Sequence, residues 1–142
     1  MRDIDIAKEI LSKESLTIVL VKNGKVIYKS KARGIKPLYI VFTTMKSEMK
    51  NCSAADKVVG KSAAWLYASA DIKELYCNVI AKKGVDILNE KCISYRSSTI
   101  VDYIKNRQKD DMCPVEKLAK EEVEFDKLLF NINKFLKENN LI

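Results

Sequence analysis

The chain has 142 residues, of which 47% are hydrophobic and 32% are charged, a balance typical of a globular domain and not of a disordered chain. No apolar run approaches the roughly 20 residues that a membrane-crossing helix needs, so we expect no membrane partner. The opening Met1–Ile6 is too acidic and too interrupted for a secretory signal. The four cysteines are widely spaced, with no CxxC pair, which favours reduced thiols over a disulfide framework. These features predict a cytoplasmic protein.

Charge is distributed unevenly along the chain. The net charge is +7, but residues 1–108 carry 20 Lys and Arg against 11 Asp and Glu, whereas residues 109–142 carry 6 against 8. Six basic residues fall between Lys22 and Lys36 with no acidic residue among them. This basic segment could attract phosphate groups or nucleic acid. The alternative is a solvated hairpin surface that lysines keep soluble.

The N-terminal part of the chain predicts a helix followed by a β-hairpin. Apolar residues recur at helical spacing over residues 6–11, which indicates a short helix. Two runs rich in β-branched residues follow, at 16–22 and 25–30. Asn23 and Gly24 join them, and this dipeptide is a strong signal for a two-residue hairpin turn because both positions adopt positive φ.

Two helices are expected next. The segment Leu38–Glu48 is ambiguous, because its aromatic and β-branched start favours a strand while its length and polar end favour a helix; we expect the helix. Ser53 is a good N-cap, with Asp56 three residues later as its capping partner. Apolar residues at helical spacing from Val59 to Ala70 then predict a helix that begins at this cap.

The remaining elements alternate between strands and helices. Strands are predicted at Glu74–Ile80 and Ile93–Ser97, with a short helix around Val85 and Leu88 between them. Three further helices are expected: one that Ser98 caps, one that begins at Pro114, and a long amphipathic one over residues 125–136.

This order predicts an α/β, three-layer fold, in which a mixed β-sheet with an N-terminal hairpin is flanked by helices. We expect one domain over residues 1–142. Its core would span about 16–120, and a C-terminal helical extension would span about 121–142.

Three blocks of the sequence resemble one known family. They are Gly34–Leu38, Ala55–Lys61 and Met112–Lys117, and they resemble the "domain of unknown function 1893" family over about Leu16 to about Lys120. The resemblance implies a cytidine-deaminase-like fold, in which the hairpin leads into the helix that carries the catalytic residues of true deaminases. It implies no established activity.

The residues do not fit a zinc deaminase. Such an enzyme needs a His or Cys ligand two positions before a catalytic Glu, and later a Pro-Cys-x-x-Cys pair. If Asp56 stands in place of that Glu, the ligand position holds Ala54. Cys113 precedes Pro114 in the reverse order, and the chain has no histidine. The sequence therefore predicts no zinc, no other cofactor and no zinc-dependent deamination.

Two further signals are rejected as evidence of function. Gly60, Lys61 and Ser62 match the end of a phosphate-binding loop, but that loop needs a glycine where this chain has Ala55, and the segment is predicted to lie within a helix. The single tryptophan, Trp65, is expected to pack in the core and not to stack on a base.

Charged residues at one predicted helix start suggest an anion site. Asp56 and Lys57 open the predicted helix, where backbone N–H groups and the helix dipole favour anions. Lys61 would lie one turn beyond Lys57 on the same face. Here Asp56 would accept a proton or orient a ligand, and the lysines would bind phosphate. The structural alternative is that Asp56 only completes a cap and that the lysines are solvated.

A second group could meet the first across a cleft. Cys113 stands at the start of another predicted helix, where the dipole and nearby Lys117 would lower the pKa of its thiol and favour a nucleophile. Glu116 lies three residues beyond it, and Asn106 and Arg107 lie in the approach to it. The alternative is that Cys113 is only a small residue at a helix cap.

Three functions therefore stay open. The preferred one is a metal-independent domain that binds a nucleotide-like phosphate compound, with or without catalysis, through the two groups above. The second is a nucleic-acid-binding module whose basic hairpin binds weakly and without sequence preference. The third is an interaction domain whose apolar C-terminal helix docks another subunit, including a second copy in a homo-oligomer.

Overall fold

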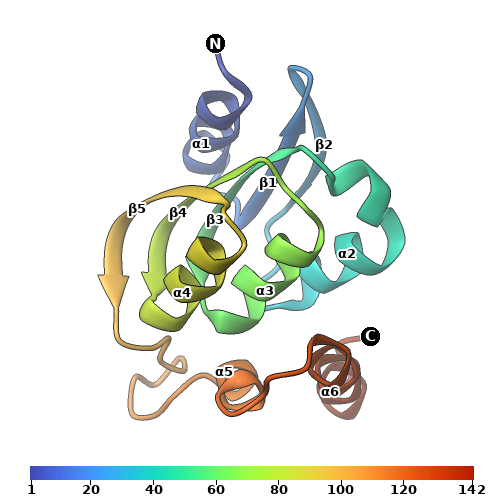
Figure 1. Ribbon diagram of the computed structural model, residues 1–142, viewed down its shortest axis with the longest axis vertical. Coiled ribbons are helices and arrows are strands. Elements are labelled where there is room, and N and C mark those ends of the chain that lie inside the picture. The colour runs from blue at the N-terminus through green and yellow to red at the C-terminus, as the bar shows by residue number, and fades with distance from the viewer.

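The computed structural model describes residues 1–142 as a five-stranded sheet with helices on both faces (Figure 1). The strands are β1 (Ile18–Lys22), β2 (Lys25–Ser30), β3 (Ser53–Val59), β4 (Glu74–Ala81) and β5 (Ser94–Val101). The helices are α1 (Asp3–Lys13), α2 (Lys36–Met49), α3 (Lys61–Ser69), α4 (Lys82–Glu90), α5 (Pro114–Ala119) and α6 (Phe125–Glu138).

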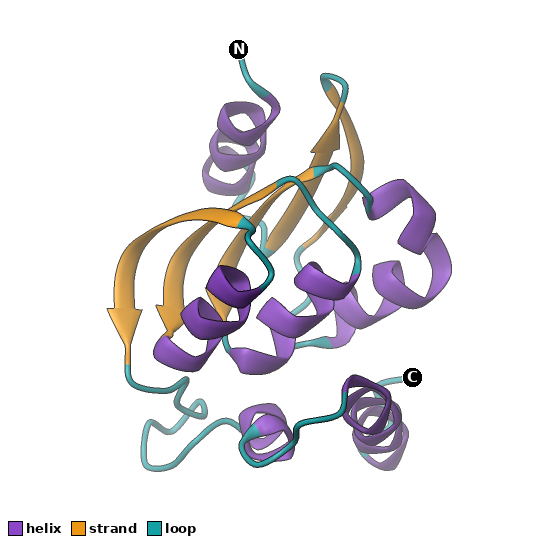
Figure 2. Ribbon diagram, in the orientation of Figure 1, coloured by secondary structure: helices purple, strands orange, loops and turns teal.

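The sheet is mixed, as the sequence predicts, and its strand order is β2-β1-β3-β4-β5. β1 runs antiparallel to both β2 and β3, whereas β3, β4 and β5 are parallel. Helix α1 covers one face of the sheet, and α2, α3 and α4 cover the other. Helices α5 and α6 lie beyond the C-terminal ends of the parallel strands (Figures 1 and 2). The predicted three-layer α/β fold is therefore confirmed. None of the helices combines the length and the apolar character that a membrane span requires.

The hairpin turn forms where the sequence places it. Asn23 and Gly24 have φ values of 53° and 77°, the left-handed conformation that a two-residue hairpin turn needs. Their backbone N–H groups donate to the two carboxylate oxygens of Asp3, each at 2.9 Å. The start of α1 is thereby tied to the tip of the hairpin.

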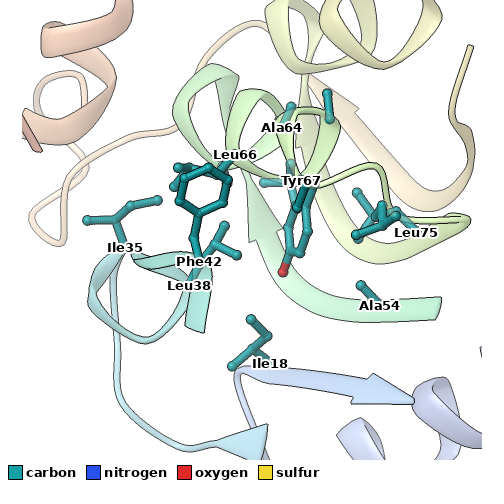
Figure 3. Close-up of a cluster of buried hydrophobic side chains, with 14 of the residues drawn as sticks. Ile18, Ile35, Leu38, Phe42, Ala54, Ala64, Leu66, Tyr67 and Leu75 are labelled. Atoms are coloured by element: carbon teal, nitrogen blue, oxygen red, sulfur yellow. The ribbon is translucent and has the colours of Figure 1, made fainter. Parts of the chain in front are cut away.

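Most of the hydrophobic core lies between the sheet and helices α2 and α3. Figure 3 shows part of this cluster, in which the Tyr67 ring of α3 points down toward β3 beside Leu66 and Leu75. A smaller cluster lies under α1 and includes Leu11 and Val19. Residues of β3 serve both clusters: Ala54 packs toward α3 and Ala55 toward α1. Their small side chains suit a strand that is covered on both faces.

The ambiguous segment after the hairpin is a helix, as expected. α2 begins at Lys36 with Pro37 in its first turn, and Leu38 and Phe42 are buried. The helix is kinked at Met45, whose φ of −136° is not helical.

The predicted helix start at Ser53 is wrong. Residues Ser53–Val59 form β3, which pairs with β1 on one side and β4 on the other. The local capping pattern is overridden because two neighbouring strands satisfy the backbone of this segment. Helix α3 begins only at Lys61, with Gly60 as its N-cap. Gly60, Lys61 and Ser62 therefore form a strand-to-helix junction and do not lie within a helix.

The helix expected after Ser98 is also wrong. β5 continues to Val101, in parallel register with β4, and a loop over residues 102–113 follows. The β-branched run Thr99-Ile100-Val101 has the side chains that suit a strand, and pairing with β4 extends it.

The two C-terminal helices pack back onto the domain. Pro114 begins α5, as predicted, and α6 buries one face of the expected amphipathic helix. The Phe125 ring lies 5.6 Å from that of Phe42 and 5.8 Å from that of Trp65. Asn133 donates to the Tyr39 hydroxyl at 2.7 Å. Trp65 accordingly packs against the core, as predicted.

Candidate functional site

The sheet separates the residues that the sequence assigns to one site. Neighbouring residues of a strand point to opposite faces. Asp56 contacts α3 through Tyr67, whereas Lys57 lines a cavity under α1. Lys61 lies at the start of α3 and contacts α5. Asp56 and Lys57 thus do not open a helix, and Lys61 does not lie one turn beyond Lys57 on a shared face.

Asp56 is held by a buried tyrosine. The Tyr67 hydroxyl donates to Asp56 Oδ2 at 2.5 Å, and the Val58 backbone N–H donates to Oδ1 at 3.2 Å. Desolvation raises the pKa of the Asp56 carboxyl to about 7, against the lowering effect of these hydrogen bonds. Tyr67 is fully buried, and burial raises its own pKa well above the ordinary value. The pair ties β3 to α3.

A second buried carboxylate occupies the start of α3. Glu116 of α5 is only 8% exposed, and its Oε2 accepts the Lys61 backbone N–H at 3.2 Å. Gly60 allows this approach, because a Cβ on it would lie 1.1 Å from Glu116 Oε1. Burial raises the pKa of Glu116, and the Lys61 N–H opposes that rise. The anion-favouring end of α3 is therefore filled by the chain itself.

The Lys61 side chain is also engaged. Its ammonium donates to the carbonyl oxygens of Ala119 at 2.7 Å and Glu122 at 2.9 Å, at the end of α5. Burial lowers the pKa of Lys61, with Lys83 adding to the effect. Lys61 and Glu116 thus close the junction between α3 and α5, which we call the α3–α5 junction.

The residues around Cys113 bind one another. Cys113 is the half-buried N-cap of α5, and its backbone N–H donates to the Ile104 carbonyl at 2.8 Å. The Lys117 ammonium pairs with Asp111 and holds the pKa of that carboxyl below its usual range. Lys117 therefore has a partner other than Cys113, and its use in activating Cys113 stays a prediction.

Asn106 and Arg107 lie in the loop over residues 102–113. The Asn106 amide donates to Asp110 Oδ1 at 2.8 Å, and the Asp110 N–H donates back to the Asn106 side chain at 3.2 Å. Arg107 is exposed and forms no ion pair within the chain. Asn106 therefore shapes the loop.

A cavity of about 310 Å³ lies between α1 and the sheet. We call it the α1 pocket, and it is lined by Lys8, Leu11, Ser12, Ser15, Lys57, Tyr76 and Asn78. Two of these residues, Lys8 and Lys57, are basic, and neither forms an ion pair within the chain. The Lys8 ammonium lies 4.8 Å from the centre of the Tyr76 ring. No carboxylate is among the lining residues.

Hydrogen bonds between strands orient the wall of the α1 pocket. The Tyr76 hydroxyl donates to Asn78 Oδ1 at 3.0 Å and lies 3.1 Å from the Ser98 hydroxyl on β5. Because Oδ1 of Asn78 is engaged, its NH₂ group remains as a donor. The hydroxyls of Ser12 and Ser15 have no partner in the chain and can also donate. The pocket therefore combines two cations with several neutral donors, which is the chemistry of an anion site.

Of the α1 pocket, sequence reasoning found only Lys57. Local patterns carry part of the missing signal: Lys8 and Ser12 are four residues apart on one helix, and Tyr76 and Asn78 are two apart on one strand. Nothing local indicates that this helix lies over this strand.

A second cavity, of about 320 Å³, lies on α6. It is lined by Glu122, Asp126, Lys127, Phe130 and Asn131, so both signs of charge are present.

In the structure, the helix that follows the hairpin is a different segment from the one that the comparison with zinc deaminases assumes. The helix that follows the hairpin is α2, not the segment with Asp56. Residues Gly34–Tyr39 at its start include no His, Cys or Glu. No three Cys, Asp or Glu side chains lie close enough together to hold a metal ion. That the protein carries no zinc stays a prediction.

One known protein family matches the chain over most of its length. The family model described as a domain of unknown function, DUF1893, matches residues 6–136. The chain belongs to this family. The match takes in most of α6, whereas the blocks that carried the resemblance end at Lys117. No curated protein matches the chain.

Solved structures support the fold. A DUF1893 family protein from Thermotoga maritima superposes with a TM-score of 0.86 at 24% identity, over 93% of this chain and 88% of that one. Two matches are weaker. RibD from Acinetobacter baumannii gives a TM-score of 0.48 at 15% identity over 66% of this chain and 33% of its own, and a dCMP deaminase from cyanophage S-TIM5 gives 0.47 at 14% over 67% and 93%.

Proposed function

We propose that this protein is a metal-independent binding domain for a small phosphate-bearing ligand of nucleotide-like size, and that the α1 pocket is its site. The observation that carries the proposal is that Lys8 and Lys57 line one cavity and neither has an acidic partner in the chain. The candidate catalytic residues Asp56 and Cys113 do not line this cavity. The proposed function is therefore binding, without an assigned reaction.

Charge supports an anionic ligand. Two lysines that line one cavity repel each other, and a phosphate bound between their ammonium groups would turn that repulsion into attraction. Hydrogen bonds to charged groups contribute about 1.5–3 kcal/mol each, more than neutral ones. Lys8 and Lys57 come from different elements, α1 and β3, so an anion bound by both would also hold α1 against the sheet.

Size and neutral donors support a small ligand with polar groups beyond the phosphate. A volume of about 310 Å³ is at the lower end of the range of small-molecule sites. Ser12 and Ser15 offer hydroxyls at the helix side, and Asn78 offers an amide at the sheet side. The Tyr76 ring lies beneath Lys8 and supplies the apolar surface of the wall.

The test is isothermal titration calorimetry with inorganic phosphate and with adenosine 5′-monophosphate. Lys8→Ala and Lys57→Ala should each weaken binding about tenfold, since each removes a charge-assisted contact worth about 1.4 kcal/mol or more. Lys91→Ala is the matched control, because Lys91 is an exposed lysine outside the pocket. Binding that Lys91→Ala weakens as much as the pocket variants do, or no binding of either ligand, would contradict the proposal.

A second candidate function rests on the basic hairpin. Lys29 pairs with Glu14 and Lys22 donates to the Glu48 carbonyl, but Lys25, Lys31 and Arg33 are exposed and unpaired. These free charges favour weak, non-specific binding of nucleic acid whose affinity falls steeply with salt.

All four cysteines are unpaired, which supports a reducing compartment such as the cytoplasm.

A further inference from the structure

We infer that a second copy of this chain pairs with the free edge of β5, antiparallel to it, so that two five-stranded sheets join into one. This inference is independent of the proposed function. It rests on the difference between the two edges of the sheet, β2 and β5.

The β5 edge lacks the features that usually prevent pairing. β5 is bonded to β4 alone, so one row of its backbone N–H and C=O groups has no strand partner. Its eight residues contain no proline, and its register with β4 shows no bulge. Arg96 is its only charged residue, and the guanidinium is directed toward Asp5 of α1, 3.9 Å away.

Apolar side chains are exposed at the end of this edge. Ile100 is 51% exposed, and Tyr103, just beyond the strand, is 40% exposed. An edge of this kind, with β-branched residues, little charge and no bulge, favours addition of another strand.

The β2 edge is protected by comparison. Lys25 and Lys29 belong to the strand itself, and lysine on an edge strand opposes pairing. The β1–β2 register shifts between Leu20 and Val21, which twists this edge further. Since Val26 is 39% exposed there, exposed apolar surface alone does not distinguish the two edges.

The identical strand is the best-matched occupant of the β5 edge. Antiparallel pairing of two β5 strands about a two-fold axis matches their lengths and closes both edges at once. The axis passes near Ser97 and Ser98, so uncharged residues meet at the centre. An eight-residue strand is about 26 Å long, and such an interface is small. We therefore expect a dimer in concentration-dependent equilibrium with the monomer.

The first test is sedimentation velocity of the full chain over a roughly hundredfold range of concentration. The expected result is a monomer–dimer equilibrium that Thr99→Lys/Ile100→Lys abolishes, because charges then line the β5 edge. Val26→Lys is the matched control on the β2 edge and should leave the dimer unchanged. Circular dichroism establishes that each variant is folded. A chain that is monomeric throughout, or a dimer that only Val26→Lys disrupts, would overturn the inference.

Cross-linking tests the orientation of the pair. Ser97→Cys and Ser98→Cys are made in a Cys92→Ser background, since Cys92 is exposed. Residues at the two-fold axis face their own copies with Cβ atoms about 4.5–5.5 Å apart, so mild oxidation should give a disulfide-linked dimer of at least one variant. Asn23→Cys on the hairpin turn should give none. Equal yields from all three variants would contradict pairing through β5.

Discussion

The α3–α5 junction and the α1 pocket both place lysines where an anion could bind, yet they differ in what faces the ammonium groups. At the junction, the Glu116 carboxylate fills the start of α3 and backbone carbonyls engage Lys61. In the α1 pocket, Lys8 and Lys57 face a cavity without an acidic partner. A polar group that the chain satisfies by itself contributes to folding, whereas an unsatisfied set of donors beside a cavity is available to a ligand.

Gly60→Ala should cause the largest loss of stability, because it disrupts the α3–α5 junction. A Cβ there would lie 1.1 Å from Glu116 Oε1, so the buried carboxylate must leave the start of α3. We expect the free energy of unfolding to fall by about 3 kcal/mol, at the upper end of the usual cost of overpacking. Denaturant unfolding measures it. Gly34→Ala is the control, with open space around it but a φ of 77°, and should cost about 1 kcal/mol. Equal losses in the two variants would show that the junction is not closed.

The success of the sequence predictions depends on how local the signal is. The turn at Asn23 and Gly24 is set by two residues, and it forms as predicted. The helix predicted from Ser53 fails because its capping pattern is also local, while the β1 and β4 partners of β3 are distant in sequence. The helix predicted to begin at Ser98 fails for the same reason, because pairing with β4 extends β5 through that position.

The candidate site shows the same limit. Lys57 lies in the α1 pocket although its predicted position at a helix start is wrong. Lys8 and Asn78 are separated by about half of the chain, and only the packing of α1 across the sheet brings them to one cavity. No spacing rule in the sequence encodes that packing.

Asp56→Asn should change the pH dependence of stability. Because burial raises the pKa of Asp56 from 3.8 to about 7, the folded state retains a proton that the unfolded state has lost between these pH values. Stability therefore falls as pH rises from about 4 to about 7. The variant should remove this fall and be more stable at pH 8 by about 2 kcal/mol; the shift alone would give about 4 kcal/mol, and partial exposure of the side chain reduces it.

Thermal unfolding between pH 4 and pH 8 measures the effect of Asp56→Asn. Asp71→Asn is its control, because Asp71 is exposed and has a φ of 56°, which asparagine tolerates. A wild-type protein whose stability rises over this pH range would contradict the assignment of a raised pKa to Asp56.

The rates at which the four cysteines are modified should differ by about tenfold or more. That corresponds to about 1.4 kcal/mol, which is smaller than the stability changes expected for Gly60→Ala and Asp56→Asn. The sequence predicts Cys113 as a nucleophile; in the structure Cys113 is half-buried, Cys52 is fully buried and Cys92 is exposed. Burial raises the pKa of Cys52 and of Cys77 to about 12. Under native alkylation with peptide mapping we expect Cys92 first and Cys113 second. Early modification of Cys77 would show that β4 opens readily.

The most direct test of the central claim is to map where a phosphate ligand binds, by ¹H–¹⁵N NMR of the full chain titrated with adenosine 5′-monophosphate. The α1 pocket and the α3–α5 junction have separate backbone amide signals. We predict that the backbone amide signals of Ser12, Lys57 and Asn78 move together and saturate, while those of Lys61 and Ser62 stay in place because Glu116 already occupies that helix start. Movement of the Lys61 and Ser62 signals with none in the α1 pocket would contradict the account.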